Sequence, residues 1–403
     1  MSRRDVIDVA VVGGGVVGTA AALAFARDGL DVVLIESREP APWSADRPDL
    51  RVYAFAPDNA ALLDSVGVWE PVRRARAQPY RAMRVWDAAG GSELAFDADA
   101  FGRPELGWIV EHGLLVDRLW QALPAAGVRL HCPDDVVGLA QDDTAATLDL
   151  ASGQRVRARL VVAADGARSA LRGLAGIGVD GRPYGQTGVV AYIESERPHA
   201  ATCWQRFLPE GPVAVLPVAD DASAAGAVER GRRSSIVWTM PDAQAARRET
   251  LDDTAFAREL EQALGGRLGG LQLVSARAAF ALQRQLAATQ HAGRVVLVGD
   301  AAHVVHPLAG QGVNLGLRDV GALRATIRAA RDAGADIASA SRLARWARTR
   351  RSDNALAAGT FDAINRVFSN DGFLPTLLRG PVLGLGTRVP GLAHALWRHA
   401  AGR

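Results

Sequence analysis

Lysine is absent from this chain of 403 residues, so arginine supplies all 46 of its basic residues. Because arginine stays protonated and is a poor nucleophile, this absence excludes Schiff-base chemistry and catalysis by a lysine amine. Cysteine is scarce as well: Cys132 and Cys203 lie far apart and form no CxxC or Cys/His pattern. The sequence therefore predicts no disulfide framework and no metal site, and it suits a reducing cytoplasm.

The chain also lacks a large charge excess and a long apolar run. Its 46 basic residues face 44 acidic ones, and a net charge of +2 gives no electrostatic reason to expect nucleic acid as the main partner. No uninterrupted apolar run reaches the roughly 18 residues that a membrane-spanning helix requires. Strand-like residues begin within a few positions of Met1, so we expect no targeting leader. These features predict a cytoplasmic protein that acts on small molecules.

The length and the hydrophobic content of 49% predict two or three structural units with a large core. From about residue 186 to residue 285, short strand-like segments dominate. The polar stretch 219–234 between two of them has the composition of an exposed hairpin tip. Residues 341–371 have a helical, arginine-rich pattern.

The N-terminal residues 5–37 read as a strand, a glycine turn, an alanine-rich helix and a second strand. Gly13, Gly15 and Gly18 form GxGxxG, which allows a tight turn, a close approach of backbone to a pyrophosphate, and close packing of helix on strand. Glu36 ends the second strand, where a carboxylate can accept hydrogen bonds from both hydroxyls of an adenosine ribose. This unit predicts a dinucleotide site.

A second motif lies near the C-terminal end of the same predicted domain. A strand-like run at 294–299 ends in Asp300, which we expect at the carboxyl edge of the sheet, beside a sugar-alcohol hydroxyl. Gly310 and Gly312 can bring backbone against a flat ring, and a helix that starts near Val313 would point its positive end at that ring. Reduced flavin carries negative charge on its pyrimidine portion, so the two motifs together favour FAD over NAD.

Three motifs carry a resemblance to a known family. Residues 13–18, Asp165–Gly166 and Gly299–Asp300, in this order, resemble the three fingerprints of the single-component aromatic hydroxylases with the para-hydroxybenzoate hydroxylase fold. Within that group, "HPLAGQGVNLGLRD" at 306–319 is similar to the signature of the ubiquinone-biosynthesis hydroxylases, the UbiH/UbiI/UbiF group. Matching segments extend along nearly the whole chain, and the last 30 or so residues are the least diagnostic.

The resemblance implies an α/β fold with an α+β second domain. A Rossmann-like FAD-binding domain would comprise 1–75, 101–185 and 286–340, a mostly antiparallel substrate domain would comprise 76–100 and 186–285, and 341–403 would form a C-terminal helical region.

The resemblance also implies roles for single residues. Asp300 would bind the ribityl chain, and Gly312, Val313 and Asn314 would line the flavin ring. Asp165 and Gly166 would lie at the FAD site, where they would also support the approach of nicotinamide. Arg51 and Arg118 would lie along the pyrophosphate and ribityl region of FAD. Pro307 would lie over the reacting face of the flavin, and His306 would lie at the substrate or oxygen site.

The implied reaction is hydroxylation of the ring of a polyprenylated phenol in ubiquinone biosynthesis. NAD(P)H would reduce noncovalently bound FAD, and O₂ would then form a flavin C4a-hydroperoxide whose distal oxygen is transferred to the ring. With one complete βαβ fingerprint in the chain, NAD(P)H is expected as a transient visitor. The choice between NADH and NADPH, the ring carbon, the prenyl length and the oligomeric state stay open, and a homo-oligomer or contact with other ubiquinone-biosynthesis proteins is compatible with the sequence.

Three other functions share parts of this pattern. An FAD monooxygenase of a small soluble aromatic or polyketide would carry the same fingerprints, and a non-catalytic FAD-binding subunit of a biosynthetic complex would bind flavin without turnover. A flavin halogenase is disfavoured, because lysine is absent and "VWTMP" at 237–241 is the only approach to a tryptophan-rich halogenase motif.

The segment 372–403 contains four arginines and no acid among many leucines and valines. Such a segment can lie on an anionic bilayer, with apolar side chains at the headgroup boundary and arginines at phosphates. Alternatively, Pro375, Pro381 and Pro390 would break it into short turns packed on the protein. A bilayer-resident substrate favours a peripheral contact with the inner face of the cell membrane.

Overall fold

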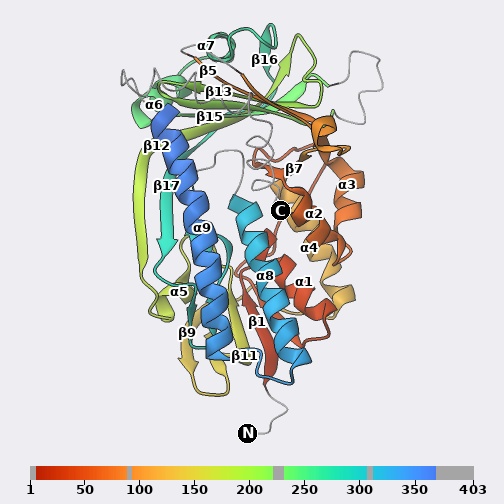
Figure 1. Cartoon of the computed structure of the whole chain (residues 1–403), viewed down its shortest axis with the longest axis vertical. Coiled ribbons are helices and arrows are strands. Elements are labelled where there is room, and N and C mark those ends of the chain that lie inside the picture. The colour runs from red at the N-terminus through yellow and green to blue at the C-terminus, as the bar shows by residue number, and fades with distance from the viewer. Residues whose placement is uncertain (1–5, 89–92, 221–230, 306–311, 369–403) are drawn as a thin grey trace.

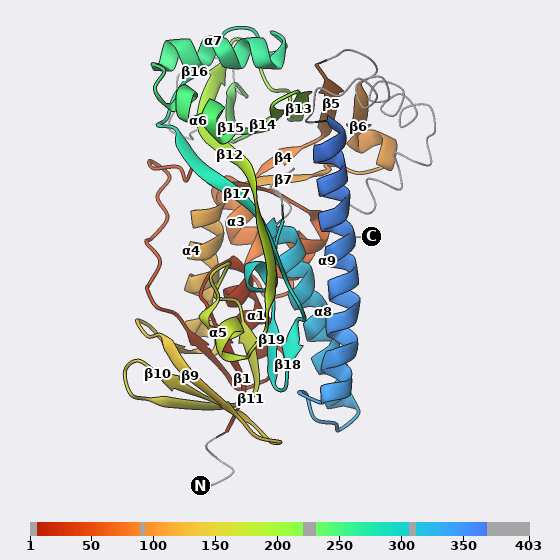
Figure 2. The ribbon, with the colours of Figure 1, turned by 90° about the vertical axis from the view of Figure 1, so that its left-hand side faces the viewer.

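The computed structural model describes residues 6–88, 93–220, 231–305 and 312–368 (Figure 1). Two large sheets lie at opposite ends of an elongated molecule, and helices fill the side between them (Figures 1 and 2). Three predictions fall on residues outside the described ranges, at least in part. They concern the first part of the motif at 306–319, the segment 372–403 and most of the hairpin tip at 219–234.

The lower sheet contains the N-terminal βαβ unit. Its strands run in the order β18-β19-β11-β1-β2-β8, with β10 and β9 extending from β11. Their bounds are β1 Ile7–Val12, β2 Val32–Ile35, β8 Arg129–His131, β9 Val136–Gln141, β10 Ala146–Leu150, β11 Arg155–Ala163, β18 His291–Ala292 and β19 Val295–Leu297. Strand β1 is parallel to both β2 and β11, and β11 is parallel to β19. The carboxyl ends of β1, β2, β11 and β19 therefore share one edge.

Both faces of this parallel sheet are covered at its centre, which explains the almost continuous apolar sequence of β1 and of residues 160–163 of β11. One face packs on α1 Val16–Arg27, α4 His112–Ala122 and α8 Gly312–Asp332, with Val9, Val11, Leu160 and Val162 in the shared core. The other face packs on the β9–β10 hairpin and on α5 Ala170–Leu174. One of the helices on the first face, α4, contacts the glycine turn after β1 through Trp120.

The upper sheet has nine strands and is mostly antiparallel, in the order β20-β17-β12-β15-β14-β13-β5-β6 with β16 beside β12. Their bounds are β5 Ala82–Asp87, β6 Leu94–Asp97, β12 Val179–Ser195, β13 Thr202–Leu208, β14 Gly211–Pro217, β15 Arg233–Pro241, β16 Leu271–Leu273, β17 Ala278–Ala287 and β20 His303–Val304. Helices α6 Asp242–Glu249 and α7 Asp253–Leu264 cover its outer face, where Trp238 packs edge-on against Phe256 at 5.7 Å between ring centroids.

A small third sheet joins the two cores. It comprises β3 Val52–Phe55, β4 Gln78–Tyr80 and β7 Gly107–Glu111, followed or flanked by α2 Pro57–Asp64 and α3 Trp69–Arg76. Tyr53 and Phe55 belong to the core of the lower sheet, whereas Ala54 and Ile109 pack with Tyr192 of the upper one. Alternate residues of β3 therefore face the two ends of the molecule, as the pleat of a strand requires.

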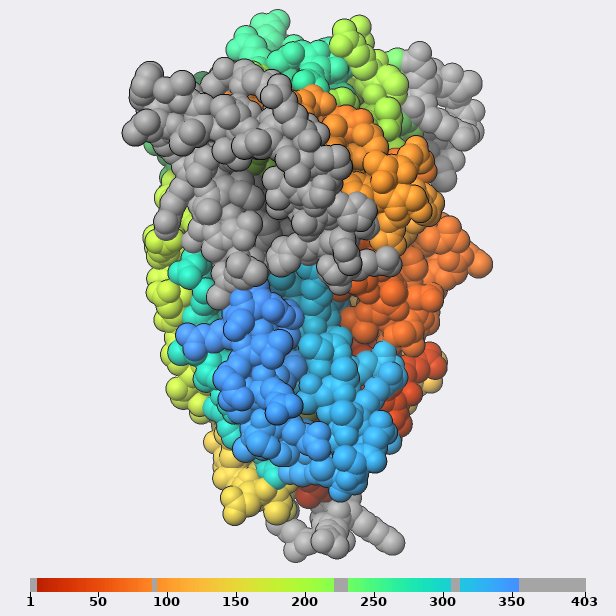
Figure 3. All heavy atoms as spheres, viewed as in Figure 1, coloured from red at the N-terminus to blue at the C-terminus, as the bar shows by residue number. Residues whose placement is uncertain are grey.

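Helix α9, Ala340–Phe368, runs along α8 (Figures 1 and 2). In the space-filling view, α8 and the first part of α9 form one continuous surface (Figure 3). None of the helices in the described ranges has the length and apolar character needed to cross a bilayer.

The predicted fold class is confirmed: a parallel, Rossmann-like sheet with helices is joined to a mostly antiparallel second sheet. The helix expected near Val313 begins at Gly312, and the expected strand 294–299 is β19 followed by a short 3₁₀ turn, η4 Gly299–Ala301. The proposed domain boundaries after 185 and 285 fall within β12 and β17, which pair continuously there apart from a bulge between Pro183 and Thr187. These boundaries stay a prediction.

Candidate functional site

The glycine turn after β1 has no room for side chains at two of its three motif positions. Gly13 has φ +105°, and a Cβ there would lie 2.3 Å from the carbonyl oxygen of Ala164. A Cβ on Gly18 would lie 1.9 Å from the carbonyl oxygen of Gly13. A Cβ on Gly15, by contrast, would have no neighbour within 4 Å. Gly15 therefore leaves open space at the N-terminus of α1, where backbone amides can bind an anion.

The peptide of Gly14 is held on both sides. Its amide donates to Oε2 of Glu36 at 2.5 Å, and its carbonyl accepts from Nε1 of Trp120 at 2.7 Å and from Oγ1 of Thr19 at 2.9 Å. Neither Trp120 nor Thr19 is among the predicted site residues. Thr19 could have been predicted to contact the glycine turn, because it is a polar residue directly after GxGxxG. Trp120 could not, because it lies in α4, 106 residues from Gly14 in the sequence, and no local motif marks it.

Glu36 directly follows β2, at the carboxyl edge of the sheet as predicted. Besides the Gly14 amide, its carboxylate accepts from Oγ of Ser37 at 2.8 Å and from the amide of Arg38 at 3.1 Å. A carboxylate offers about four lone-pair sites, so these contacts orient it and leave capacity for a ribose hydroxyl. The ribose role stays a prediction.

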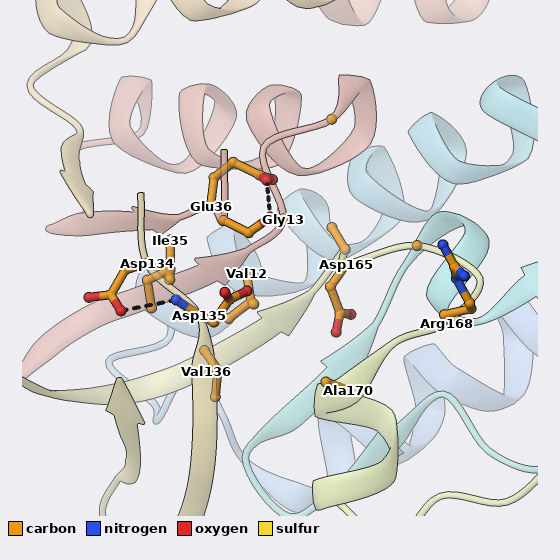
Figure 4. A pocket seen from close by; sticks show the side chains of 14 residues that line it. Val12, Gly13, Ile35, Glu36, Asp134, Asp135, Val136, Asp165, Arg168 and Ala170 are labelled. Atoms are coloured by element: carbon orange, nitrogen blue, oxygen red, sulfur yellow. Dashed lines mark hydrogen bonds between the residues drawn. The ribbon is translucent and has the colours of Figure 1, made fainter. Parts of the chain in front are cut away.

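A cleft of about 410 Å³ opens at this edge (Figure 4). It is lined by Val12, Gly13, Gly15, Ile35, Glu36, Ser37, Asp134, Asp135, Val136, Ala164, Asp165, Gly166, Arg168 and Ala170. The structure thus brings the predicted Gly13, Gly15, Glu36, Asp165 and Gly166 into one cavity. It adds the segment 134–136 and Arg168, which were not predicted to contribute. Asp134 and Asp135 lie between β8 and β9, Val136 begins β9, and the segment has no motif of its own.

Asp165 supplies an observation that bears on a ligand. It lies in the loop after β11, and its Oδ2 accepts from the amide of Leu171 at 3.1 Å. Its other oxygen, Oδ1, is buried and has no hydrogen-bond partner among the described residues. Leaving such an acceptor unsatisfied costs about 1–3 kcal/mol, so the cleft suits a ligand that carries hydroxyl or N–H donors. The neighbouring Gly166 has φ +82°, which lets the chain turn back at this point.

Asp300 lies in η4, directly after β19, and is half-buried. The turn is pressed against α1 and α8 through two glycines. A Cβ on Gly299 would lie 3.3 Å from Val17, and one on Gly316 would lie 2.7 Å from Val17 and 3.0 Å from the Cα of Gly299. Gly316 was not predicted, although it follows the predicted Asn314 by two residues. The close packing fixes where the sheet edge presents Asp300.

The first turn of α8 is tied to the small sheet. The Asn314 side chain donates to the carbonyl of Ala54 at 2.7 Å and accepts from the amide of Ala56 at 3.0 Å and from Nδ2 of Asn59 at 2.9 Å. Val313 is buried in the core behind it. Asn314 thus positions the helix start, so its proposed contact with the ring would come from backbone. His306, Pro307 and Gly310 lie outside the described residues.

The two predicted arginines lie over different aromatic rings. Arg51 is exposed, with its guanidinium 5.3 Å from the ring centroid of Tyr53. Burial raises the pKa of Tyr53, and the charge of Asp300 raises it further, which places Tyr53 near the η4 turn. Arg118 pairs with Asp117 and lies 5.6 Å from the ring centroid of Trp43. Arg51 is therefore linked through Tyr53 to the surroundings of Asp300.

His112 extends the group around Tyr53. Its Nδ1 shares a hydrogen bond of 2.9 Å with the hydroxyl of Tyr53. Burial, and then the positive charge of Arg51, lower the pKa of His112 to about 4. The imidazole is therefore neutral at physiological pH.

Known proteins resemble the chain in sequence and in fold. The family model for the FAD binding domain matches residues 6–352. A 3-demethoxyubiquinol 3-hydroxylase of Escherichia coli is 38% identical over 94% of this chain and 93% of its own. A ubiquinone hydroxylase, UbiL, of Rhodospirillum rubrum is 39% identical over 100% of this chain and 91% of its own.

Among solved structures, p-nitrophenol 4-monooxygenase of Pseudomonas putida superposes with a TM-score of 0.76 over 97% of this chain and 96% of its own. Its identity is 20%, so it supports the fold alone. The alignment with UbiL extends over the whole chain, so it includes the glycine turn, the Asp165 loop and the Asp300 turn. The chain therefore belongs to the FAD binding domain family and, within it, to the ubiquinone-biosynthesis hydroxylases.

Proposed function

We propose that this protein is an FAD-dependent monooxygenase that hydroxylates the ring of a polyprenylated phenol in ubiquinone biosynthesis, with NAD(P)H and O₂ as co-substrates. The observation that carries the proposal is the identity of 38% and 39%, along nearly the whole chain, to two proteins named as hydroxylases of ubiquinol or ubiquinone. The site described above supports it, because two parts of the parallel sheet edge offer the contacts that a long dinucleotide needs.

The residues fit FAD in a consistent order along that edge. The open amides at Gly15 suit the pyrophosphate, and Glu36 and the cleft beside it suit the adenosine. The buried, unsatisfied Oδ1 of Asp165 and the half-buried Asp300 are acceptors for hydroxyl donors of the sugar and the ribityl chain. The N-terminus of α8 would face the flavin ring with its positive end. All of these contacts are polar or come from backbone, so the binding is noncovalent.

When bound, FAD supplies the redox chemistry that accepts electrons from NAD(P)H and activates O₂. The protein's own contribution is to hold the cofactor, orient the phenol and keep water from the reacting atoms. The sequence resemblance assigns Pro307 to the reacting face and His306 to the substrate or oxygen site, and both assignments remain proposals.

We also propose that the enzyme meets its substrate peripherally at an anionic membrane surface, through residues 372–403. The supporting observation is the sequence of that segment, which alternates arginines with leucines and valines and lacks acids. A polyprenyl phenol dissolves in the bilayer, so an enzyme that binds it at the surface needs such a contact.

The decisive experiment is product analysis with a panel of phenols that differ in ring substitution and in prenyl length. The purified protein is incubated with FAD, NADH or NADPH, and O₂, and the products are identified by mass spectrometry. A hydroxylated prenylphenol supports the proposal and identifies the ring carbon. Turnover restricted to small soluble aromatics or polyketides would replace it with the first alternative, and flavin binding without any turnover would indicate a non-catalytic subunit.

A further inference from the structure

Asp319, on α8, is a buried carboxylate that joins two parts of the molecule. Its side chain is fully buried, and four hydrogen-bond donors surround it. Oδ2 accepts from the amide of Gly299 at 3.1 Å and from Nε2 of His303 at 2.6 Å. Oδ1 accepts from Nε of Arg350 at 2.8 Å and from Nδ2 of Asn354 at 3.2 Å. One oxygen therefore faces the η4 turn, and the other faces α9.

The two donors on Oδ2 flank Asp300 in the sequence. Gly299 precedes Asp300 directly, and His303 follows it by three residues, at the start of β20. Asp319 thus fixes both ends of the short segment that presents Asp300. The close contact between Gly316 and Gly299 brings α8 near enough for these bonds.

The two donors on Oδ1 come from successive turns of α9. Arg350 is 7% exposed and Asn354 is 2% exposed. The guanidinium of Arg350 also donates to Oδ1 of Asn354 at 3.1 Å and to Asp353 at 2.8 Å, so it has a fixed orientation. Burial favours the protonated acid at Asp319, but the charges and hydrogen bonds of His303 and Arg350 outweigh burial and hold its pKa below the usual value. The carboxylate is therefore ionised and depends on its partners.

We propose that Arg350 of α9 is a positioning residue for the cofactor site: through Asp319 it orients the turn that presents Asp300, so that flavin binding depends on a helix outside the nucleotide fingerprints. The inference rests on the proposed role of Asp300 at the ribityl chain. Removing Arg350 takes a permanent positive charge and a hydrogen-bond donor away from a buried carboxylate. The carboxylate then rotates or takes up a proton, and both responses disturb its bonds to Gly299 and His303.

A matched control lies on the same helix bundle. Arg324 of α8 is 8% exposed and forms a bidentate pair with Asp28, with Nε at 2.9 Å and a terminal nitrogen at 2.7 Å. Asp28 follows α1 and keeps a second partner, Arg328, as Asp319 keeps His303. Arg324→Met therefore removes a comparably buried ion pair away from the η4 turn.

The test compares Arg350→Met, Arg350→Lys and Arg324→Met in the full chain, with FAD affinity, the visible flavin spectrum and the melting temperature as measurements. Arg350→Met should weaken FAD binding about three- to thirtyfold and alter the flavin spectrum, and Arg350→Lys should restore most of both because it keeps the charge. Arg324→Met should lower the melting temperature while keeping wild-type affinity and spectrum. Wild-type affinity and spectrum in folded Arg350→Met, or equal weakening in both Met variants, would overturn the proposal.

The double variant Asp300→Ala/Arg350→Met separates this inference from the proposed cofactor site. If Arg350 acts through the turn, its replacement should cost little further affinity once Asp300 is removed, and the two effects should be clearly less than multiplicative. Multiplicative effects would refute the coupling and leave the site intact. Wild-type affinity in Asp300→Ala alone would refute the site assignment. If Arg350→Met does not fold, Asn354→Ala, which removes one donor to the same oxygen, replaces it in the comparison and is judged by the same outcomes.

Discussion

Gly18 lies so close to Gly13 that a Cβ at residue 18 would stand 1.9 Å from the carbonyl oxygen of residue 13. The obstacle is backbone, which cannot rotate away as a side chain can. Gly18→Ala should therefore lower the free energy of unfolding by about 1–3 kcal/mol, the usual cost of overpacking, even without cofactor. Urea unfolding of the apoprotein measures the effect. Gly321→Ala in α8, where a Cβ would have no neighbour within 4 Å, is the control and should be neutral or stabilising.

Gly15→Ala should behave in the opposite way. Gly15 has φ −72°, which alanine adopts readily, and a Cβ would enter open space. The apoprotein should unfold at the wild-type urea concentration, whereas FAD affinity should fall by about tenfold or more, equivalent to ~1.4 kcal/mol, because the methyl group occupies the space for the pyrophosphate. Equal stability together with undiminished affinity would show that the pyrophosphate binds elsewhere.

Asp300→Ala should weaken FAD binding by about 1.5–3 kcal/mol, the contribution of a hydrogen bond to a charged acceptor. The measurement is a fluorescence titration of apoprotein with FAD. Asp300→Asn is the companion variant, because it keeps an acceptor without the charge. Its FAD affinity should lie between those of the wild type and of Asp300→Ala. Wild-type affinity in Asp300→Ala would remove this residue from the ribityl site.

The purified protein should be yellow, and acid precipitation should release its flavin into the supernatant. The reason is that the predicted contacts are polar or backbone, and no recognisable attachment motif supplies a linking His or Cys. Absorbance spectra of the supernatant and the pellet decide the matter. Flavin that stays with the pellet would indicate a covalent bond, and a colourless protein that gains no flavin absorbance with added FAD would contradict the cofactor assignment.

His112 should stay neutral down to about pH 4, because burial and the charge of Arg51 lower its pKa from 6.5 to about 4. Between these values the unfolded chain binds a proton at this position and the folded chain does not, so the contribution of His112 to stability decreases as pH falls. NMR titration of the imidazole gives the pKa directly. Unfolding free energies at pH 7 and pH 5 should differ less in His112→Gln than in the wild type, and an imidazole that titrates near 6.5 would contradict the assignment.

Deletion of residues 372–403 should weaken binding to anionic liposomes and lower turnover of a long-chain prenylphenol. FAD content and NAD(P)H oxidation with a short-chain analogue should not change. The physical reason is that each basic residue near an anionic surface contributes about 1 kcal/mol, in addition to apolar insertion. Cosedimentation with anionic and with neutral liposomes measures the effect. A truncated protein that sediments as well as the full chain would show that the segment has a structural role.

The local motifs made the parallel sheet and its ligand edge predictable. GxGxxG, the helix after it and Glu36 lie within one continuous unit, so residue spacing alone determined their relation. Asp300 was placed correctly at the sheet edge because an apolar strand precedes it. In both cases the physical cause is short-range.

Contacts between distant segments could not be predicted in this way. Trp120 bonds to Gly14 over 106 residues of sequence, and the segment 134–136 enters the cleft because a neighbouring strand ends there. Asp319 had a weak local signal: it stands between Leu315 and Leu323, at helical spacing, among mostly apolar buried residues of α8. Its partner Arg350 could not be distinguished by sequence from the other arginines of α9.

Strands β12 and β17 form a ladder between the ends of the molecule, paired from Val179 and Ala287 to Val190 and Ala278 (Figure 2). At ~3.3 Å per residue, two residues added to each strand would lengthen this ladder by roughly 7 Å and keep every side chain on its original face. A single added residue would instead turn the faces over. Insertions of two residues in each strand would therefore lengthen the connection between the two sheets while keeping the same side chains on each face of the ladder.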